Sequence, residues 1–156
     1  MRIIGIDPGL AIVGFAIIDL ERGKKTLIDV GVIRTAPELS ISERLLEIYK
    51  DMEELLKEYK PEHCSIEQIF FSNNVSTAIN VAQARGTILL ALEKSKIKIR
   101  EYSPSAMKLA MTGDGTADKK AIQKMLCLEL NLDEPPKPDD AADALSLALT
   151  LATELR

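Results

Sequence analysis

The first 34 residues contain three strand-like segments so close together that they favour one arrangement. Residues 2–7, 12–19 and 26–34 are each rich in apolar and β-branched residues, and short turn sequences separate them. Parallel neighbours would need a crossover connection of a dozen or more residues, which these turns do not provide. The three segments are therefore predicted to form an antiparallel meander.

The hydrophobic period changes after the third strand. Ser40-Ile41-Ser42-Glu43 has the form of a capping box, and the apolar residues after it recur at helical spacing. Further strands are predicted at 64–68 and 97–102, and further helices at 74–94, 103–111, 116–131 and 140–155, with Thr116 as a cap. This order predicts an α/β protein, residues 1–156 forming a single domain. Its mixed five-stranded sheet, three antiparallel strands and then parallel strands, is flanked by helices, with the first and fourth strands adjacent and parallel.

Composition excludes several classes of protein. Hydrophobic residues at 46% and charged residues at 28% indicate a globular chain. Cys64 and Cys127 are too few for a disulfide framework, and a single histidine excludes a Cys/His zinc site. There is no run of eighteen apolar residues and no leader sequence, so a cytoplasmic protein is expected.

The net charge of −4 does not by itself favour a nucleic-acid partner, but the charges are unevenly distributed. Residues 94–124 contain eight basic and three acidic residues, whereas residues 38–67 contain nine acidic and four basic ones. One face could therefore attract phosphates while another repels them. The alternative is that both stretches are simply solvated helix surfaces.

Two acidic residues stand at predicted strand ends. Asp7 ends the first strand, directly before Pro8-Gly9, and Glu67 ends the fourth. If these strands are neighbours, their carboxylates lie close together, which is unfavourable unless one is protonated or a cation bridges them. The alternative for each acid alone is that it caps the turn that follows it.

Two more acids begin the final helix. Asp140 and Asp143 are three residues apart and so face the same side, although they could also cap the helix, as could Asp139. Together with the two strand-end acids they can line one crevice. Such hard oxygen ligands suit Mg²⁺ or Mn²⁺. Two such ions can activate water and stabilise the leaving oxygen in phosphodiester hydrolysis, a reaction that requires neither histidine nor cysteine.

Four motifs in order resemble a known family. They are Gly5-Ile6-Asp7-Pro8-Gly9 with Gly14, Ile66-Glu67-Gln68, Gln83-Ala84-Arg85-Gly86 and Asp140-Ala141-Ala142-Asp143-Ala144. Over essentially the whole chain they resemble the RuvC family of Holliday-junction resolvases, the crossover junction endodeoxyribonucleases. The resemblance implies an RNase H-like fold, a homodimer and Mg²⁺-dependent symmetric nicking of four-way junction DNA in recombination and repair. It also implies a partner, the RuvA–RuvB branch-migration complex.

The resemblance also assigns residues. Asp7, Glu67, Asp140 and Asp143 match the catalytic acids, which would hold two Mg²⁺ ions, with Mn²⁺ as a substitute. Phe70 matches an aromatic residue that contacts the junction core, and Lys108 and Lys119 match basic positions that face DNA. The segment Phe71-Ser72-Asn73-Asn74 departs from the family, whose members often carry a lysine there.

Lys119 and Lys120 are also candidates on their own chemistry. They open a predicted helix, where a cation opposes the helix dipole, and this suggests an external anion such as a DNA phosphate. The alternative is that both are solvated surface residues.

Three other functions fit parts of the sequence. A sugar-kinase or actin-like nucleotide binder can share the first motif, but it clamps the nucleotide between two related domains and this chain supplies one. A non-catalytic DNA-binding module would favour the loss of acids near phosphates. A nuclease of the same fold that acts on RNA or on simpler DNA is the remaining alternative, and cleavage of a four-way junction beside duplex and single strands would separate these cases.

Overall fold

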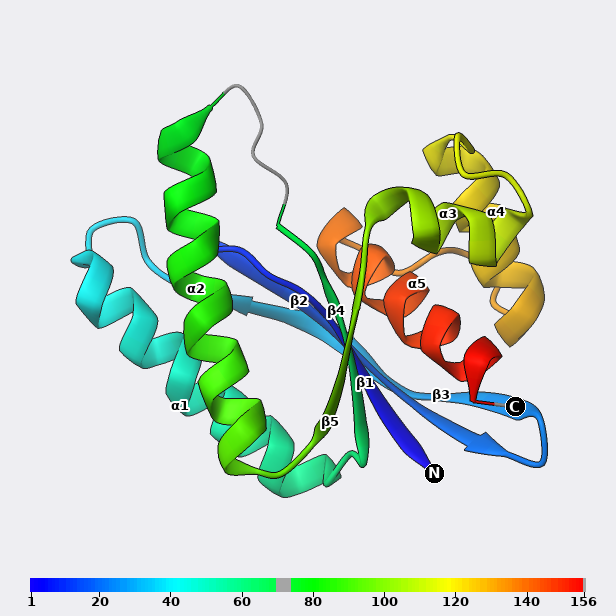
Figure 1. Ribbon diagram of the computed structural model, residues 1–156, viewed down its shortest axis with the longest axis horizontal. Helices are drawn as coiled ribbons and strands as arrows, with labels where there is room; N and C mark the ends of the chain where they lie inside the picture. The colour runs from blue at the N-terminus through cyan, green and yellow to red at the C-terminus, as the bar shows by residue number, and fades with distance from the viewer. Residues whose placement is uncertain (70–73, 156) are drawn as a thin grey trace.

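The computed structural model describes residues 1–69 and 74–155. Its five strands form one sheet in the order β3-β2-β1-β4-β5 (Figure 1). The strands are β1 (Arg2–Asp7), β2 (Ile12–Glu21), β3 (Lys24–Arg34), β4 (His63–Glu67) and β5 (Lys98–Tyr102). The first three pair antiparallel, whereas β4 runs parallel to both β1 and β5. The predicted mixed sheet and the pairing of the first and fourth strands are confirmed.

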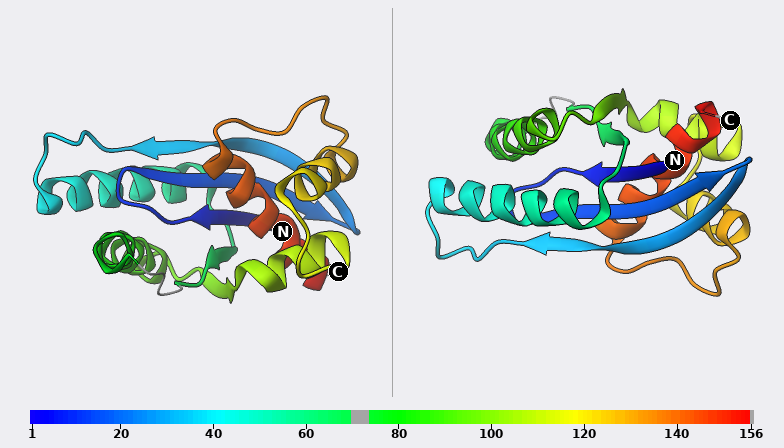
Figure 2. Two further views of the ribbon diagram at one scale, coloured as in Figure 1. Left: turned by 90° about the horizontal axis from the view of Figure 1, so that it is seen from above. Right: turned by 90° about the horizontal axis from the view of Figure 1, so that it is seen from below.

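Helices cover both faces of the sheet (Figure 2). One layer consists of α1 (Ile41–Tyr59) and α2 (Val75–Lys94), and the other of α3 (Pro104–Thr112), α4 (Lys119–Leu130) and α5 (Asp139–Glu154). Because side chains of a strand alternate between faces, neighbouring residues of β1 enter different cores. Ile3 packs in the core beneath α3, α4 and α5, whereas Ile4 and Ile6 pack in the core beneath α1 and α2.

Of the helix caps considered for α1, α4 and α5, the structure confirms the first and differs at the other two. Ser40 and Glu43 form the predicted capping box of α1. Helix α4 is capped by Asp118 and not by Thr116, because the Asp118 carboxylate accepts a hydrogen bond from the backbone of Ala121 at 2.9 Å. Helix α5 follows Pro138 without any side-chain cap, so its first acids are free for other contacts.

Two glycines let α5 lie directly on the sheet. A Cβ atom at Gly5 would be 2.0 Å from the backbone oxygen of Ala144, and one at Gly14 would be 2.0 Å from that of Asp140. No side chain fits at either position. Since Gly14 pairs with Asp7 across the sheet, this contact brings the first turn of α5 to the carboxyl end of β1.

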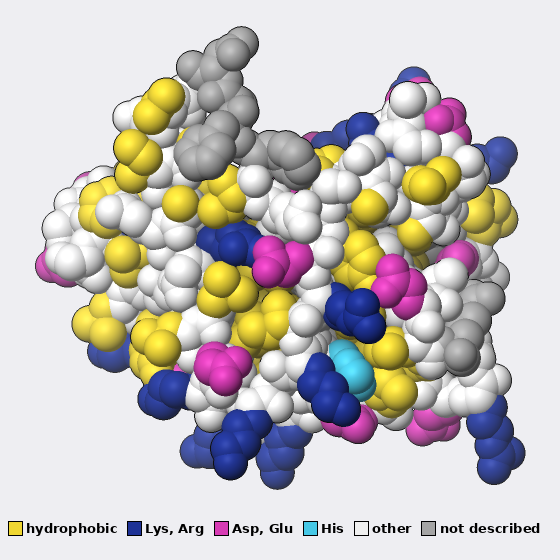
Figure 3. Space-filling model, viewed as in Figure 1, with side chains coloured by type: hydrophobic (Ala, Val, Ile, Leu, Met, Phe, Trp, Pro, Cys, Tyr) yellow, Lys and Arg dark blue, Asp and Glu magenta, His cyan; other side chains and the backbone are white. Residues whose placement is uncertain are grey.

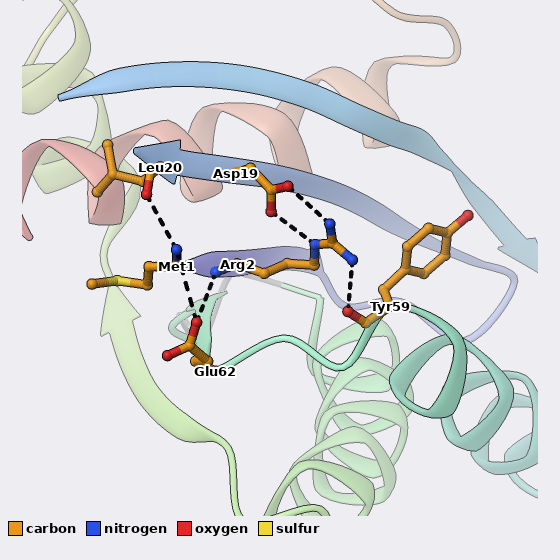
Figure 4. A network of polar contacts seen from close by, with 6 residues as sticks. All are labelled: Met1, Arg2, Asp19, Leu20, Tyr59 and Glu62. Atoms are coloured by element: carbon orange, nitrogen blue, oxygen red, sulfur yellow. Dashed lines mark hydrogen bonds and ion pairs between the residues drawn. The ribbon is translucent and has the colours of Figure 1, made fainter. Parts of the chain in front are cut away.

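Charged groups fasten the opposite end of β1 (Figure 4). The Arg2 guanidinium donates two hydrogen bonds of 2.8 Å to Asp19 on β2 and one of 3.0 Å to the backbone oxygen of Tyr59. The backbone of Arg2 also donates to the Glu62 carboxylate at 3.2 Å. These contacts join β1, β2 and the segment after α1, and they fix the strand whose other end carries Asp7.

Helix α2 is the one element of the described chain that is long and apolar enough to span a membrane by length and composition alone. Its residues Ala84, Ile88 and Leu92 are fully buried in the core shared with α1. These contacts are those of a helix that covers a sheet.

Candidate active site

The sheet brings two acidic side chains together at the carboxyl ends of adjacent parallel strands. The register pairs Ile6 of β1 with Ile66 of β4, so Asp7 and Glu67 follow side by side. Both side chains are half-buried, and a hydrogen bond joins the two carboxyl groups. Such an edge of an α/β sheet is the usual place for a ligand.

Burial and mutual repulsion change the protonation of this pair. Burial, followed by the charges of Glu67, Asp143 and Asp140, raises the pKa of Asp7 to about 8. Burial and Asp143 also raise the pKa of Glu67, while the hydrogen bond from Asp7 opposes that rise. At neutral pH and without a cation, Asp7 therefore keeps its proton and donates a hydrogen bond to the Glu67 carboxylate.

The start of α5 adds the other two acids. Asp143 is half-buried, and its pKa is raised first by burial and then by Asp139 and Asp140, against the opposing charge of Lys119. Asp140 lines a groove together with Pro8 and Gly9 of the loop that follows Asp7. Helix capping does not account for these acids, because no side chain caps α5.

The four acids fit a divalent cation by their chemistry. In the described part of the chain, no three acidic, histidine or cysteine side chains form a ready-made ligand group. The acids are nevertheless close enough to raise the pKa of Asp7, which a bound cation would reverse by taking the place of the proton. Their hard oxygens suit Mg²⁺ or Mn²⁺, with water or a substrate phosphate completing the ligand set.

Two lysines reach the acids from the side of α3 and α4. Lys108 and Lys119 line a pocket of about 240 Å³ together with Glu67 and Asp143. The remaining wall is mainly apolar and consists of Pro104, Met107, Ile122 and Leu147. Cations beside a cluster of carboxylates could hold the phosphates of a nucleic acid that the acids would otherwise repel.

Lys119 was predicted to bind an external anion, but in the structure it pairs with an acidic residue of the same chain. Its amine forms an ion pair of 2.5 Å with Asp139, and both side chains are more than half exposed. Lys120 is exposed in the same first turn of α4 and is not among the residues that line the pocket. The structure thus places Lys119 beside the acids and Lys120 farther out.

The basic stretch 94–124 does not form one surface. Lys98 of β5 lies opposite His63 of β4, at the end of the sheet away from Glu67. Dark-blue Lys and Arg side chains gather along the lower edge in Figure 3, below α2 and β5. The lysines near the acids are a separate group on α3 and α4. Phe70, the predicted junction contact, lies outside the described residues, as do 71–73.

Arg85 belongs to one of the four motifs, Gln83-Ala84-Arg85-Gly86, and the structure gives its side chain two contacts. Its Nε donates to the backbone oxygen of Glu67 at 3.0 Å, and its Nη2 pairs with Glu101 of β5. The side chain is 12% exposed. A single arginine within the otherwise uncharged first part of α2 was the available signal.

Comparison with known proteins agrees with this geometry. A family model described as "Crossover junction endodeoxyribonuclease RuvC" matches residues 3–151. A protein of that name from Fusobacterium nucleatum is 50% identical over 150 residues, 96% of this chain and 79% of the relative. Another from Prochlorococcus marinus (strain MIT 9312) is 50% identical over 154 residues, 99% and 98% of the two chains.

Solved structures agree as well. The structure described as T. thermophilus RuvC in complex with Holliday junction substrate is similar with a TM-score of 0.94 and 32% identity, over 100% of this chain and 95% of that one. The yeast mitochondrial resolvase Ydc2, at 13% identity and a TM-score of 0.70, shares the fold. With the four acids at the ends of β1 and β4 and the start of α5, the chain belongs to the RuvC family of crossover junction endodeoxyribonucleases.

Proposed function

We propose that this protein resolves four-way DNA junctions by metal-dependent hydrolysis of phosphodiester bonds, in recombination and repair. The observation that carries the proposal is the convergence of Asp7, Glu67, Asp140 and Asp143 at one edge of the sheet in a RuvC family member. The similarity to a RuvC described in complex with a Holliday junction substrate supports the choice of substrate.

The acids would hold two Mg²⁺ ions, with Mn²⁺ as a substitute. Such ions, when bound, activate water and stabilise the leaving oxygen. Asp7 would lose its proton when the cation site is filled, because positive charge opposes both the burial and the repulsion by the other acids that raise its pKa. Arg85 holds the backbone of Glu67 in place, and Lys108 and Lys119 offset the negative charge of the DNA.

Cleavage of a synthetic four-way junction, compared with matched duplex, single-stranded DNA and RNA, tests this function. We expect paired nicks in the junction with Mg²⁺ and none in EDTA. The Asp7→Asn variant should still bind the junction but should not nick it. Binding without cleavage would favour a non-catalytic module. Equal cleavage of the simpler substrates would favour a less selective nuclease of the same fold.

A homodimer is part of the proposal, because symmetric nicking needs two sites. An apolar stripe runs along the outer surface of α2 at helical spacing, formed by Val75, Ile79, Ala82, Gly86 and Leu90. Val75, Ile79 and Leu90 are 64%, 51% and 58% exposed. The small residues in the middle would let a second α2 helix approach closely in a two-fold arrangement.

Light scattering after size exclusion tests the dimer. Ile79→Glu should yield monomers, because it places a charge in the middle of the stripe. Leu128→Glu is the matched control, since Leu128 is 65% exposed on α4 and outside the stripe. A dimer that survives Ile79→Glu, or a wild-type monomer at micromolar concentration, would contradict this interface.

The family resemblance also supports a cytoplasmic protein that acts with a RuvA–RuvB branch-migration complex. Addition of RuvA and RuvB from the same organism to the cleavage reaction should change the positions or the rate of nicking on a mobile junction. An identical nick pattern with and without them would count against the partnership.

A further inference from the structure

A second hollow adjoins the acids on the opposite face of the sheet from Lys108 and Lys119. This groove of about 440 Å³ lies between the loop after Asp7 and the first turns of α1 and α2. Its lining is Pro8, Gly9, Leu10, Ala11, Ile12, Arg44, Thr77, Asn80, Val81 and Asp140. Asp140 is the one acid of this lining, so the groove is continuous with the candidate active site.

Arg44 is held in this groove by neutral partners. Its Nε donates to the hydroxyl of Thr35 at 2.8 Å, and that hydroxyl donates to the backbone oxygen of Leu10 at 2.6 Å. The backbone of Thr35 also donates to Ala11 at 3.1 Å, and Thr35 is only 7% exposed. The guanidinium is therefore fixed relative to the loop that follows Asp7.

The charge of Arg44 has no internal counterpart among the described residues. The ion pairs found there do not include it. Its hydrogen bond uses Nε alone, which leaves the two Nη groups for another acceptor. Arg44 is half-buried, and a guanidinium that is oriented but has no carboxylate partner is suited to an external anion.

We propose that Arg44 binds a backbone phosphate of the cleaved DNA strand, next to the scissile phosphate on the α1 side of the acids. This inference rests on the proposed function. A strand that crosses the acids continues to both sides, where Lys108 and Lys119 lie in one hollow and Arg44 in the other. The planar guanidinium matches phosphate oxygens, and Thr77 and Asn80 offer further polar groups to the backbone.

A scan with neutral phosphates tests the contact. Each phosphate that flanks the scissile position is replaced in turn by a methylphosphonate, and junction affinity is measured in EDTA, which prevents cleavage. Replacement at one position, on one side of the scissile phosphate, should weaken junction binding by the wild type roughly tenfold. This is the effect expected for loss of a hydrogen bond to a charged group. The junction affinity of Arg44→Gln should not change when that phosphate is replaced, but it should respond to the other replacements as the wild type does.

Arg22→Gln is the matched control, with the same chemical change in the turn between β2 and β3, at the far end of the sheet from Asp7. It should reproduce the wild-type scan. If Arg44→Gln fails to fold, Arg44→Lys carries the test, because lysine keeps the charge but not the fork and should reduce the penalty at the same position.

The outcomes separate the two proposals. If the wild type cleaves junctions and both Arg44 variants give the same methylphosphonate scan as the wild type, the role of Arg44 is overturned and the proposed function stands. A wild type that does not cleave junctions contradicts the proposed function itself.

Discussion

The guanidinium of Arg85 joins the backbone oxygen of Glu67 to the carboxylate of Glu101, so α2 fastens the ends of two parallel strands at once. Glu67 is a proposed metal ligand, and its main chain is fixed by this contact. Arg85 is therefore a positioning residue that acts through Glu67.

Arg85→Lys should reduce cleavage roughly tenfold and raise the Mg²⁺ concentration for half-maximal activity, with little change in junction affinity. Lysine lacks the fork that reaches both partners, and loss of a charged hydrogen bond costs about 1.5–3 kcal/mol. Cleavage measured against Mg²⁺ concentration checks this. A loss of affinity with an unchanged Mg²⁺ requirement would instead indicate that Arg85 binds DNA directly.

The stability of the metal-free protein should fall as the pH rises. The pKa of Asp7 is about 8 in the folded protein, against about 4 in an unfolded chain. Between these values the folded state retains a proton that the unfolded state has lost, so the free energy of unfolding decreases until the pH passes about 8. Urea melts in EDTA across this range measure the effect. Asp7→Asn should flatten the profile, and an unchanged slope would remove Asp7 as its source.

Divalent metal should stabilise the protein near neutral pH. An ion that binds only the folded state raises its stability by mass action, and here it also relieves repulsion among the four acids. Asp143→Asn should reduce the shift that Mn²⁺ produces in the melting temperature. No shift of the wild type at any Mn²⁺ concentration that leaves the protein in solution would mean that metal binds only together with DNA.

Lys119→Ala distinguishes two roles for this lysine. If Lys119 leaves Asp139 to neutralise a DNA phosphate, the log–log dependence of junction affinity on salt should become shallower by about 0.9. If it only pairs with Asp139, the slope stays the same. Lys98→Ala, at the other end of the sheet, is the control and should leave the slope unchanged.

Gly14→Ala should impair both folding and cleavage. The added Cβ would meet the backbone of Asp140 at 2.0 Å, so α5 must move away from β2. We expect a loss of about 1–3 kcal/mol in stability, as for overpacked cores, and reduced activity because the acids of α5 move away from Asp7. Gly115→Ala is a control for stability, since a Cβ there would make only ordinary van der Waals contacts, the nearest at 3.4 Å from the backbone oxygen of Ser105. Equal effects of the two substitutions on the free energy of unfolding would contradict this account.

The sequence predicted the positions that depend on local pattern. Runs of apolar residues followed by turn residues mark the ends of strands, so Asp7 and Glu67 could be assigned to strand ends from the sequence. The capping box at Ser40 could be recognised in the same way, from its local pattern. The start of α5 could not be predicted in detail. Asp139 looked like a cap, but it pairs with Lys119, which is distant in the sequence.

Residues whose partners lie far along the chain were the ones that the sequence left without a role. Arg44 lies in a stretch with more acids than bases, and only the fold brings it to Thr35 and the loop after Asp7. Arg85 reaches Glu67 across eighteen positions. No local period carries such information, because it arises from tertiary packing alone.

The contacts of Gly5 and Gly14 with α5 also have a consequence for protein engineering. Main-chain atoms of Asp140, Ala144 and Ala148, together with the Cβ of Ala148, meet the two glycines, so the separation between this helix and the strands depends on these contacts more than on the side chains elsewhere in the two cores. A combinatorial library could therefore vary the apolar interior widely and keep the spacing of the four acids. The same library would lose that spacing if either glycine were varied, even to alanine.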